Sequence, residues 1–228
     1  MTTAVPDLTR PVRPLALAAI ALCGVLASAF LGGTTNAVNG LVSPTYFVTI
    51  MRWENVGDVW AASVAQGVFE GLCFGVFFSL VFTAATGVIT RGSCHFGFAF
   101  RHLLGILGAT YICWAFGGLC AIGLAALSPG FYRSTFYGVP QNFNQMLGYA
   151  WVGGSIWGAE LGALVSVVIG LVMLWTNWRR LLARQRALSD GRPAGFQVGG
   201  RSEQIVATQQ KLKADVPFIS PGSGPAAR

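Results

Sequence analysis

Four stretches of the chain are long, apolar and almost free of charge. Two of them contain no charged side chain, and the other two contain one each, Glu70 and Glu160. A helix needs about 20 predominantly apolar residues to span a bilayer, and each stretch is long enough. The pattern therefore predicts an all-α protein, a four-helix transmembrane bundle, with spans at about residues 15–33, 59–89, 103–127 and 147–175.

The composition agrees with this prediction and excludes a water-soluble domain. Of the 228 residues, 54% are hydrophobic and only 10% are charged, and the mean hydropathy is +0.59. A soluble domain has about 25% charged residues. Too few charged side chains are present to cover the surface of a soluble protein of this length.

The basic residues predict the orientation in the membrane. Of the 15 Lys and Arg residues, 13 fall in the N-terminal segment, the loop between the second and third spans, and the C-terminal segment. The two remaining segments contain only Arg52 and Arg133. Because cytoplasmic segments are enriched in Lys and Arg, both termini are expected in the cytoplasm.

Three regions follow from this orientation: a cytoplasmic segment 1–14, a membrane domain 15–178 and a basic tail 179–228. The first span also fits a signal peptide, since basic residues precede it and Ala27-Ser28-Ala29 resembles a cleavage site. The tail is rich in Gly, Pro, Ser and Gln, so we expect most of it to be disordered. Its basic residues are sparse and lack interleaved aromatics, so the bilayer, and not nucleic acid, is the expected partner.

A short motif occurs once in each half of the chain. Ser-Pro-Thr-Tyr-Phe follows the first span and Ser-Pro-Gly-Phe-Tyr follows the third. Serine at a helix N-cap accepts an early N–H, and proline suits the first helical position. Each motif therefore predicts a short helix, which the aromatic pair would hold at the outer membrane interface. The motif residues are Ser43, Pro44, Tyr46, Phe47, Ser128, Pro129, Phe131 and Tyr132.

The second span of each half also carries a row of small residues at a spacing of four. Small residues at this spacing let helix backbones approach closely. An offset of 87 positions aligns the two rows, so we expect two duplicated helical hairpins fused as parallel repeats. The residues expected at helix contacts are Gly67, Gly71, Gly75, Gly154, Gly158 and Gly162.

The Ser-Pro-x-Tyr-Phe motif, together with residues 149–162, resembles an uncharacterised family of four-span integral membrane proteins of bacteria. Members usually carry an acidic residue where this chain has Thr45. The resemblance implies a multi-pass protein of the bacterial inner membrane. It implies an architecture and no activity.

Glu70 and Glu160 are the residues most informative about function. A carboxyl group inside a span is costly and usually faces a cavity or a partner. Gln66 lies one turn from Glu70, and Asn36 and Asn39 lie near the outer end of the first span. These five residues form a candidate polar or ion site. Glu160 lies about 200° around its helix from Gly158, so the last span must have two occupied faces.

Enzyme chemistry finds little support. There is no HExxH sequence, and Ser155 has no histidine on its side of the membrane. Cys94, His95 and His102 lie in one inner loop without the usual spacing of a metal site. No catalytic residue, metal or cofactor is expected.

Two functions remain. The first is a structural or interaction component that packs through its small-residue faces, with a second copy or another membrane protein as partner. The second is a small transporter or channel that uses Glu70 and Glu160. A transport site needs both carboxyls open to a cavity, whereas a packing protein keeps them sealed and paired.

Overall fold

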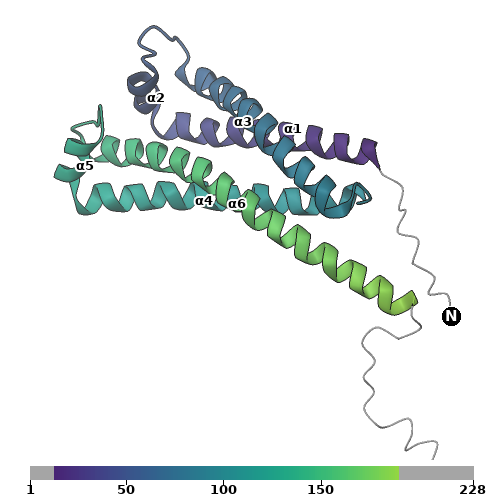
Figure 1. Ribbon diagram of the computed structural model, residues 1–228. Helices are drawn as coiled ribbons and strands as arrows, with labels where there is room; N and C mark the ends of the chain where they lie inside the picture. The colour runs from purple at the N-terminus through teal and green to yellow at the C-terminus, as the bar shows by residue number, and fades with distance from the viewer. Residues whose placement is uncertain (1–12, 190–228) are drawn as a thin grey trace, which may run out of the picture. The chain divides into compact units, whose positions relative to one another are not determined.

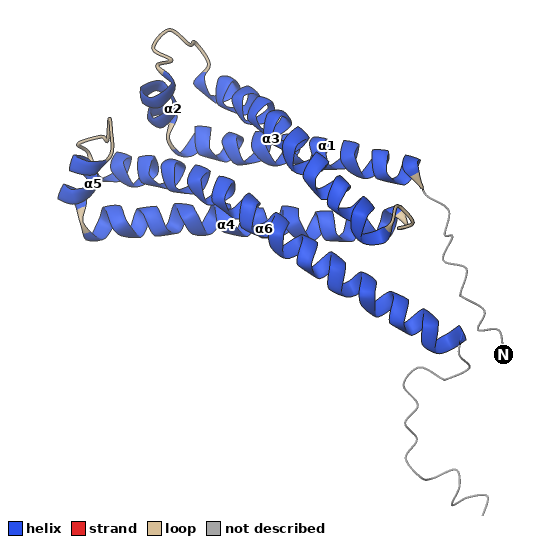
Figure 2. Ribbon diagram, in the orientation of Figure 1, coloured by secondary structure: helices blue, strands red, loops and turns tan. Residues whose placement is uncertain are grey.

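The computed structural model describes residues 13–189, and every regular element within them is a helix (Figures 1 and 2). The helices are α1 (Pro14–Val42), α2 (Pro44–Met51), α3 (Val59–Thr90), α4 (Phe96–Leu127), α5 (Pro129–Thr135) and α6 (Phe143–Ser189). Four of them, α1, α3, α4 and α6, are long and apolar enough to cross a membrane. The predicted all-α class and the four apolar helices are thus confirmed. The described residues up to Arg180 form one compact unit, to which the contacts below belong.

The long helices extend beyond the predicted spans. Helix α1 continues from residue 33 to Val42 because its polar residues do not interrupt it. Thr34 Oγ1 donates a hydrogen bond to Phe30 O (2.8 Å) and Thr35 Oγ1 donates one to Leu31 O (2.9 Å), so both hydroxyls are satisfied by the preceding turn. Hydropathy identifies only the apolar part of a spanning helix. The helix itself continues as long as its backbone hydrogen bonds continue, so it can be longer than the predicted span.

The last helix corrects the predicted boundary of the tail. Helix α6 runs to Ser189, so residues 179–189 are helical and not part of a disordered tail. Regular i to i−4 bonding continues there without a Gly or Pro to stop it. The rest of the predicted tail, 190–228, and residues 1–12 lie outside the described residues.

Both motif serines join two helices at a single residue. Helices α2 and α5 begin at Pro44 and Pro129, as the motif predicts. The predicted serine caps are wrong, because neither hydroxyl accepts a cap hydrogen bond. Instead, the backbone N–H of Ser43 donates to Asn39 O and that of Ser128 donates to Leu124 O, each at 3.0 Å. Each serine therefore closes the preceding spanning helix while the next helix starts.

The two aromatic residues of each motif differ in burial. Phe47 and Tyr132, the second of each pair, are buried inside the chain. Phe47 stacks on Trp53 with ring centroids 6.0 Å apart, and Tyr132 packs in a cluster with Met146. Only Phe131 is exposed like a residue of an aromatic belt. The expectation that both aromatics of a pair face the interface is therefore wrong for the second position.

The first hairpin is held by close backbone contact between α1 and α3 (Figure 1). A Cβ atom on Gly71 would meet the carbonyl oxygen of Ser28, and one on Gly75 would lie 2.8 Å from Ser28 Cβ. A Cβ atom on Gly67 would lie 2.7 Å from Asn36 Cβ. The glycine row of α3 thus faces α1 with no space for a side chain.

The second hairpin, α4 and α6, has the same kind of contact. A Cβ atom on Gly154 would lie 2.5 Å from Gly117 O, and one on Gly158 would lie 3.0 Å from Gly117 Cα. A Cβ atom on Gly162 would lie 3.0 Å from Cys113 Sγ. The glycine row of α6 therefore faces α4.

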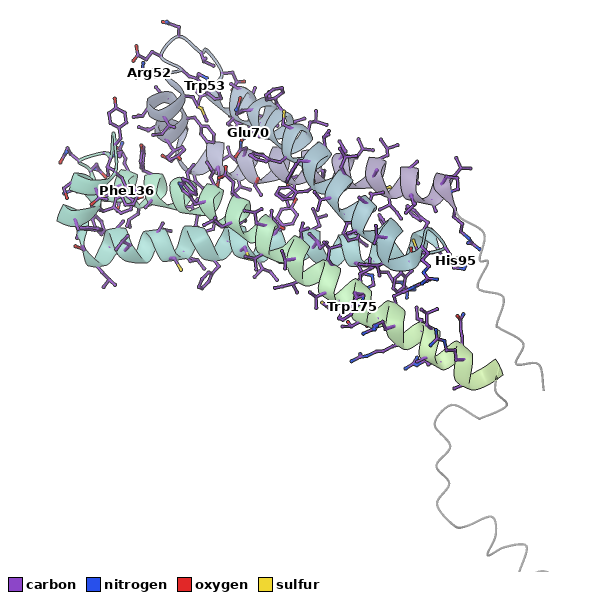
Figure 3. All side chains as sticks on the ribbon, viewed as in Figure 1. Arg52, Trp53, Glu70, His95, Phe136 and Trp175 are labelled. Atoms are coloured by element: carbon purple, nitrogen blue, oxygen red, sulfur yellow. The ribbon has the colours of Figure 1, made fainter. Side chains whose placement is uncertain are left out.

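The two ends of the unit differ in what they contain. At one end, the backbone N–H of Arg13 donates to Gly92 O (2.8 Å), and Arg13 Nη1 donates to His95 Nδ1 (2.6 Å). Figure 3 shows His95 at this end, whereas Arg52, Trp53 and Phe136 lie at the opposite end with α2 and α5. We call these the His95 end and the α2–α5 end.

Candidate functional site

A cavity of about 460 Å³ lies among the four long helices. Small-molecule sites have volumes of about 300–1,000 Å³. Four of the five residues of the candidate polar site line it, and they come from three helices. Asn36 and Asn39 belong to α1, Glu70 to α3 and Glu160 to α6. Residues more than 100 positions apart in the sequence thus border one space.

Glu70 is half-buried on the part of α3 nearer to α2 (Figure 3). Gln66, one turn earlier, donates from Nε2 to Glu70 Oε1 at 2.7 Å. Gln66 itself is not among the residues lining the cavity, so it acts as a hydrogen-bond donor behind the carboxyl group. This bond orients one carboxyl oxygen and leaves the other available to the cavity.

Glu160 faces the cavity from the opposite hairpin. Gly158, two positions earlier, faces α4, so α6 has two occupied faces. The Glu160 side chain is exposed and that of Glu70 is half-buried, so neither is fully sealed within the bundle. Neither carboxyl is therefore sealed in the way expected of a packing protein, and both border the cavity.

Among the residues that the structure describes, no basic side chain lines the cavity. Its lining there includes no Lys, Arg or His, and both carboxyl groups border the same space. Carboxylates in such a position attract cations and hydrogen-bond donors. The arrangement suits a positively charged group or a proton more than an anion.

Asn39 contributes an unused donor to the same cavity. The residue is 0% exposed, and its Oδ1 accepts a hydrogen bond from Ser155 Oγ on α6 at 3.0 Å. Its Nδ2 is buried and has no hydrogen-bond partner among the described residues. A buried donor without a partner is costly and rare in folded proteins. Asn39 Nδ2 is therefore a hydrogen-bond donor that finds no acceptor within residues 13–189.

Tyr46 of the motif, expected at the membrane interface, packs against α6 and is not among the residues that line the cavity. Its ring lies 3.3 Å from the position of a Cβ atom on Gly153 and 4.9 Å, centroid to centroid, from Tyr149. Burial raises the pKa of the Tyr46 phenol, and the charges of Glu160 and Glu70 raise it further. The phenol stays protonated at neutral pH and can donate a hydrogen bond. The motif repeat drew attention to this residue, but no sequence signal indicated that the charges of the two carboxyls would act on its phenol.

Away from the carboxyls, the cavity is apolar and reaches the surface of the unit. Phe77 of α3 and Trp157 of α6 both line it and are 60% and 62% exposed. Phe74 and Leu161 also line it and are exposed. In four helices that cross a membrane, such residues are in contact with lipid. The cavity therefore opens sideways, between α3 and α6.

Of the residues considered for metal binding, Cys94 and His95 lie in the loop before α4, whereas His102 lies within α4 and the prediction that it belongs to the loop is wrong. Both histidines have other partners. His95 accepts from Arg13, and Asn177 Nδ2 donates to His102 Nε2 at 3.1 Å. Cys94 is buried. Between residues 13 and 189, no group of three metal-ligating side chains is close enough to hold an ion.

The chain was also compared with known proteins. No protein-family model, curated protein or solved structure matches it.

Proposed function

We propose that the protein is a small transporter or channel in which Glu70 and Glu160 take up a proton or a cationic ligand. The observation that carries this proposal is that both carboxyls border one cavity among four spanning helices, and that its lining contains no basic side chain within residues 13–189. A carboxyl group in such a place costs free energy that a purely structural protein has no reason to retain.

The proposal of a structural or interaction component finds less support. Such a protein would need small-residue faces that are free to bind a partner. In this chain, Gly71 is covered by Ser28 of α1 and Gly158 by Cys113 of α4. Both rows are used within their own hairpins, which favours the carboxylate site as the basis of function.

We also propose that the two hairpins are fused copies of one unit. A Cβ atom on Gly32 would meet Gly67 O, and one on Gly117, 85 positions later, would meet Gly154 O. The contact of Gly71 with Ser28 O likewise corresponds to that of Gly158 with Cys113 O. Parallel repeats with a site at their interface are a common transporter architecture. In this arrangement α2 and α5 are the matching interfacial helices.

The orientation of the unit is open to a direct test. We expect the His95 end to face the cytoplasm, because most basic residues flank it. A reporter active only in the periplasm, fused after Arg186, should be silent, and the same reporter inserted after Glu54 should be active. The reverse pattern would contradict the four-span topology proposed here.

Flux through purified protein in proteoliposomes tests the proposed function. A pH step should drive a proton or cation flux in the wild type, and Glu70→Gln or Glu160→Gln should reduce it at least about tenfold. The amide is similar in size and still forms hydrogen bonds, but it cannot exchange a proton or carry the charge.

The control is Glu54→Gln, the same chemical change at an exposed residue between α2 and α3. It should leave the flux unchanged. A transport site at these carboxyls would be refuted if the wild type shows no flux, or if Glu70→Gln, Glu160→Gln and Glu54→Gln all show the same flux. A structural or interaction component would then be the better proposal.

A further inference from the structure

We propose that the ligand of the cavity is a membrane-soluble amine, with a cationic head that carries an acceptor oxygen and with an apolar chain. This inference rests on the proposed carboxylate site and names the class of molecule that the site takes. It also predicts that the ligand approaches from the lipid side.

The charge of the head follows from the polar part of the cavity. Glu70 and Glu160 face the same space from opposite hairpins, and in the part of the chain that the structure describes no Lys, Arg or His of the lining neutralises them. An alkylamine is protonated at neutral pH, like the lysine side chain. Its N–H groups can bond to both carboxylates, and aromatic rings such as Trp157 add favourable contact with a cation.

The acceptor oxygen follows from Asn39. Its Nδ2 lacks a partner in the described part of the chain, although the side chain is 0% exposed and lines the cavity. Ser155 already occupies its Oδ1. A hydroxyl or ester oxygen next to the amine would accept this hydrogen bond.

The apolar chain follows from the rest of the lining. On α6, the carboxyl of Glu160 is followed toward the His95 end by Ala163, Leu164 and Val167, all of which border the cavity. On α3, Glu70 is followed by Phe74, Phe77 and Phe78. A chain lying along these residues replaces contacts with lipid tails, and the exposed Phe77 and Trp157 mark where it enters.

Binding to protein in lipid nanodiscs tests the inference independently of transport. The probe is radiolabelled 1-aminododecan-2-ol, measured at equilibrium after subtraction of empty nanodiscs. Three matched molecules each lack one feature: dodecan-2-ol lacks the amine, dodecylamine lacks the oxygen, and 1-aminopropan-2-ol lacks the chain. We expect saturable binding of the probe, with dodecan-2-ol and 1-aminopropan-2-ol each bound at least about tenfold more weakly.

Substitutions locate the binding site. Glu70→Gln combined with Glu160→Gln should weaken binding of the probe at least about tenfold, because the cation loses both charged partners. Ala163→Phe should do the same by filling the apolar part, whereas Val165→Phe, at an exposed position outside the lining, should not. Asn39→Ala should remove the preference, about fivefold, for the amino alcohol over dodecylamine.

The outcomes separate this inference from the proposed function. If dodecan-2-ol or 1-aminopropan-2-ol binds as tightly as the probe, the inference is wrong. The proposed transport function would still stand if the flux depends on the two carboxyls. Binding as expected without any flux would refute transport and leave the amine site standing. Absence of saturable probe binding to the wild type would overturn the inference outright. Because the four molecules are compared on the wild-type protein, the result does not depend on a variant that fails to fold.

Discussion

Adding one methyl group at Gly71 or Gly158 should separate the two helices of a hairpin and destabilise the protein. A Cβ atom on Gly71 would meet Ser28 O and lie 2.8 Å from Ala29 Cα. One on Gly158 would meet Cys113 O. These neighbours are backbone atoms, so a whole helix must move to make space. We expect Gly71→Ala and Gly158→Ala to lower the free energy of unfolding by about 1–3 kcal/mol, and the corresponding Leu variants to yield no folded protein.

Two other glycines provide the control for this prediction. Among the described residues, no atom lies within 4 Å of the position of a Cβ atom on Gly105 or Gly108 of α4. Gly105→Ala and Gly108→Ala should therefore be neutral or stabilise the helix by up to about 1 kcal/mol, since alanine is the better helix former. Thermal denaturation in detergent measures all four variants. Equal stability of the two pairs would mean that the close helix contacts described here do not form.

The sequence was sufficient to predict the spanning helices and the small-residue faces. Long stretches without charge are explained by helices that span a membrane. Glycines four positions apart lie on the same face of a helix, whatever the helix packs against. The sequence does not indicate which helix each small-residue face contacts, because a row of small residues can pack against any helix that approaches closely. Gly67 and Gly154 meet Gly32 and Gly117 within their hairpins, and nothing local to the rows indicates this.

The sequence predicts the individual residues of the candidate site, but not that they border the same cavity. The spacing of Gln66 and Glu70 places them on one helix face, where they form the hydrogen bond at 2.7 Å. That Asn39 and Glu160 border the same cavity depends on how two hairpins pack, which involves contacts between distant segments such as Asn39 with Ser155. The packing of Tyr46 against α6 was missed for the same reason.

The polar residues of the cavity do not follow the correspondence between the hairpins. The offset of 87 that aligns the glycine rows places Trp157 opposite Glu70 and Cys73 opposite Glu160. Glu70 and Trp157 nevertheless both line the cavity. Under the proposed duplication, matching positions of the cavity wall thus carry a carboxyl group in one hairpin and an aromatic ring in the other. A single cationic head fits this asymmetric pair better than two identical ligands would.

The second large effect is expected at Phe47, a fully buried residue of α2. Phe47 is 0% exposed and stacks on Trp53, whereas Phe131 of α5 is 52% exposed. Deleting a buried phenyl ring removes its contacts and leaves a void, which costs about 3–5 kcal/mol. We therefore expect Phe47→Ala to lower the free energy of unfolding by about this amount in detergent, and Phe131→Ala to change it by less than about 0.5 kcal/mol.

Because α2 also carries Tyr46, a protein that still folds after Phe47→Ala should lose the ring contact of Tyr46 with Tyr149, now 4.9 Å between centroids. Near-ultraviolet circular dichroism of the tyrosines would register this loss. Unchanged stability and an unchanged spectrum would mean that α2 lies on the lipid surface, as an interfacial helix without an anchor in the bundle.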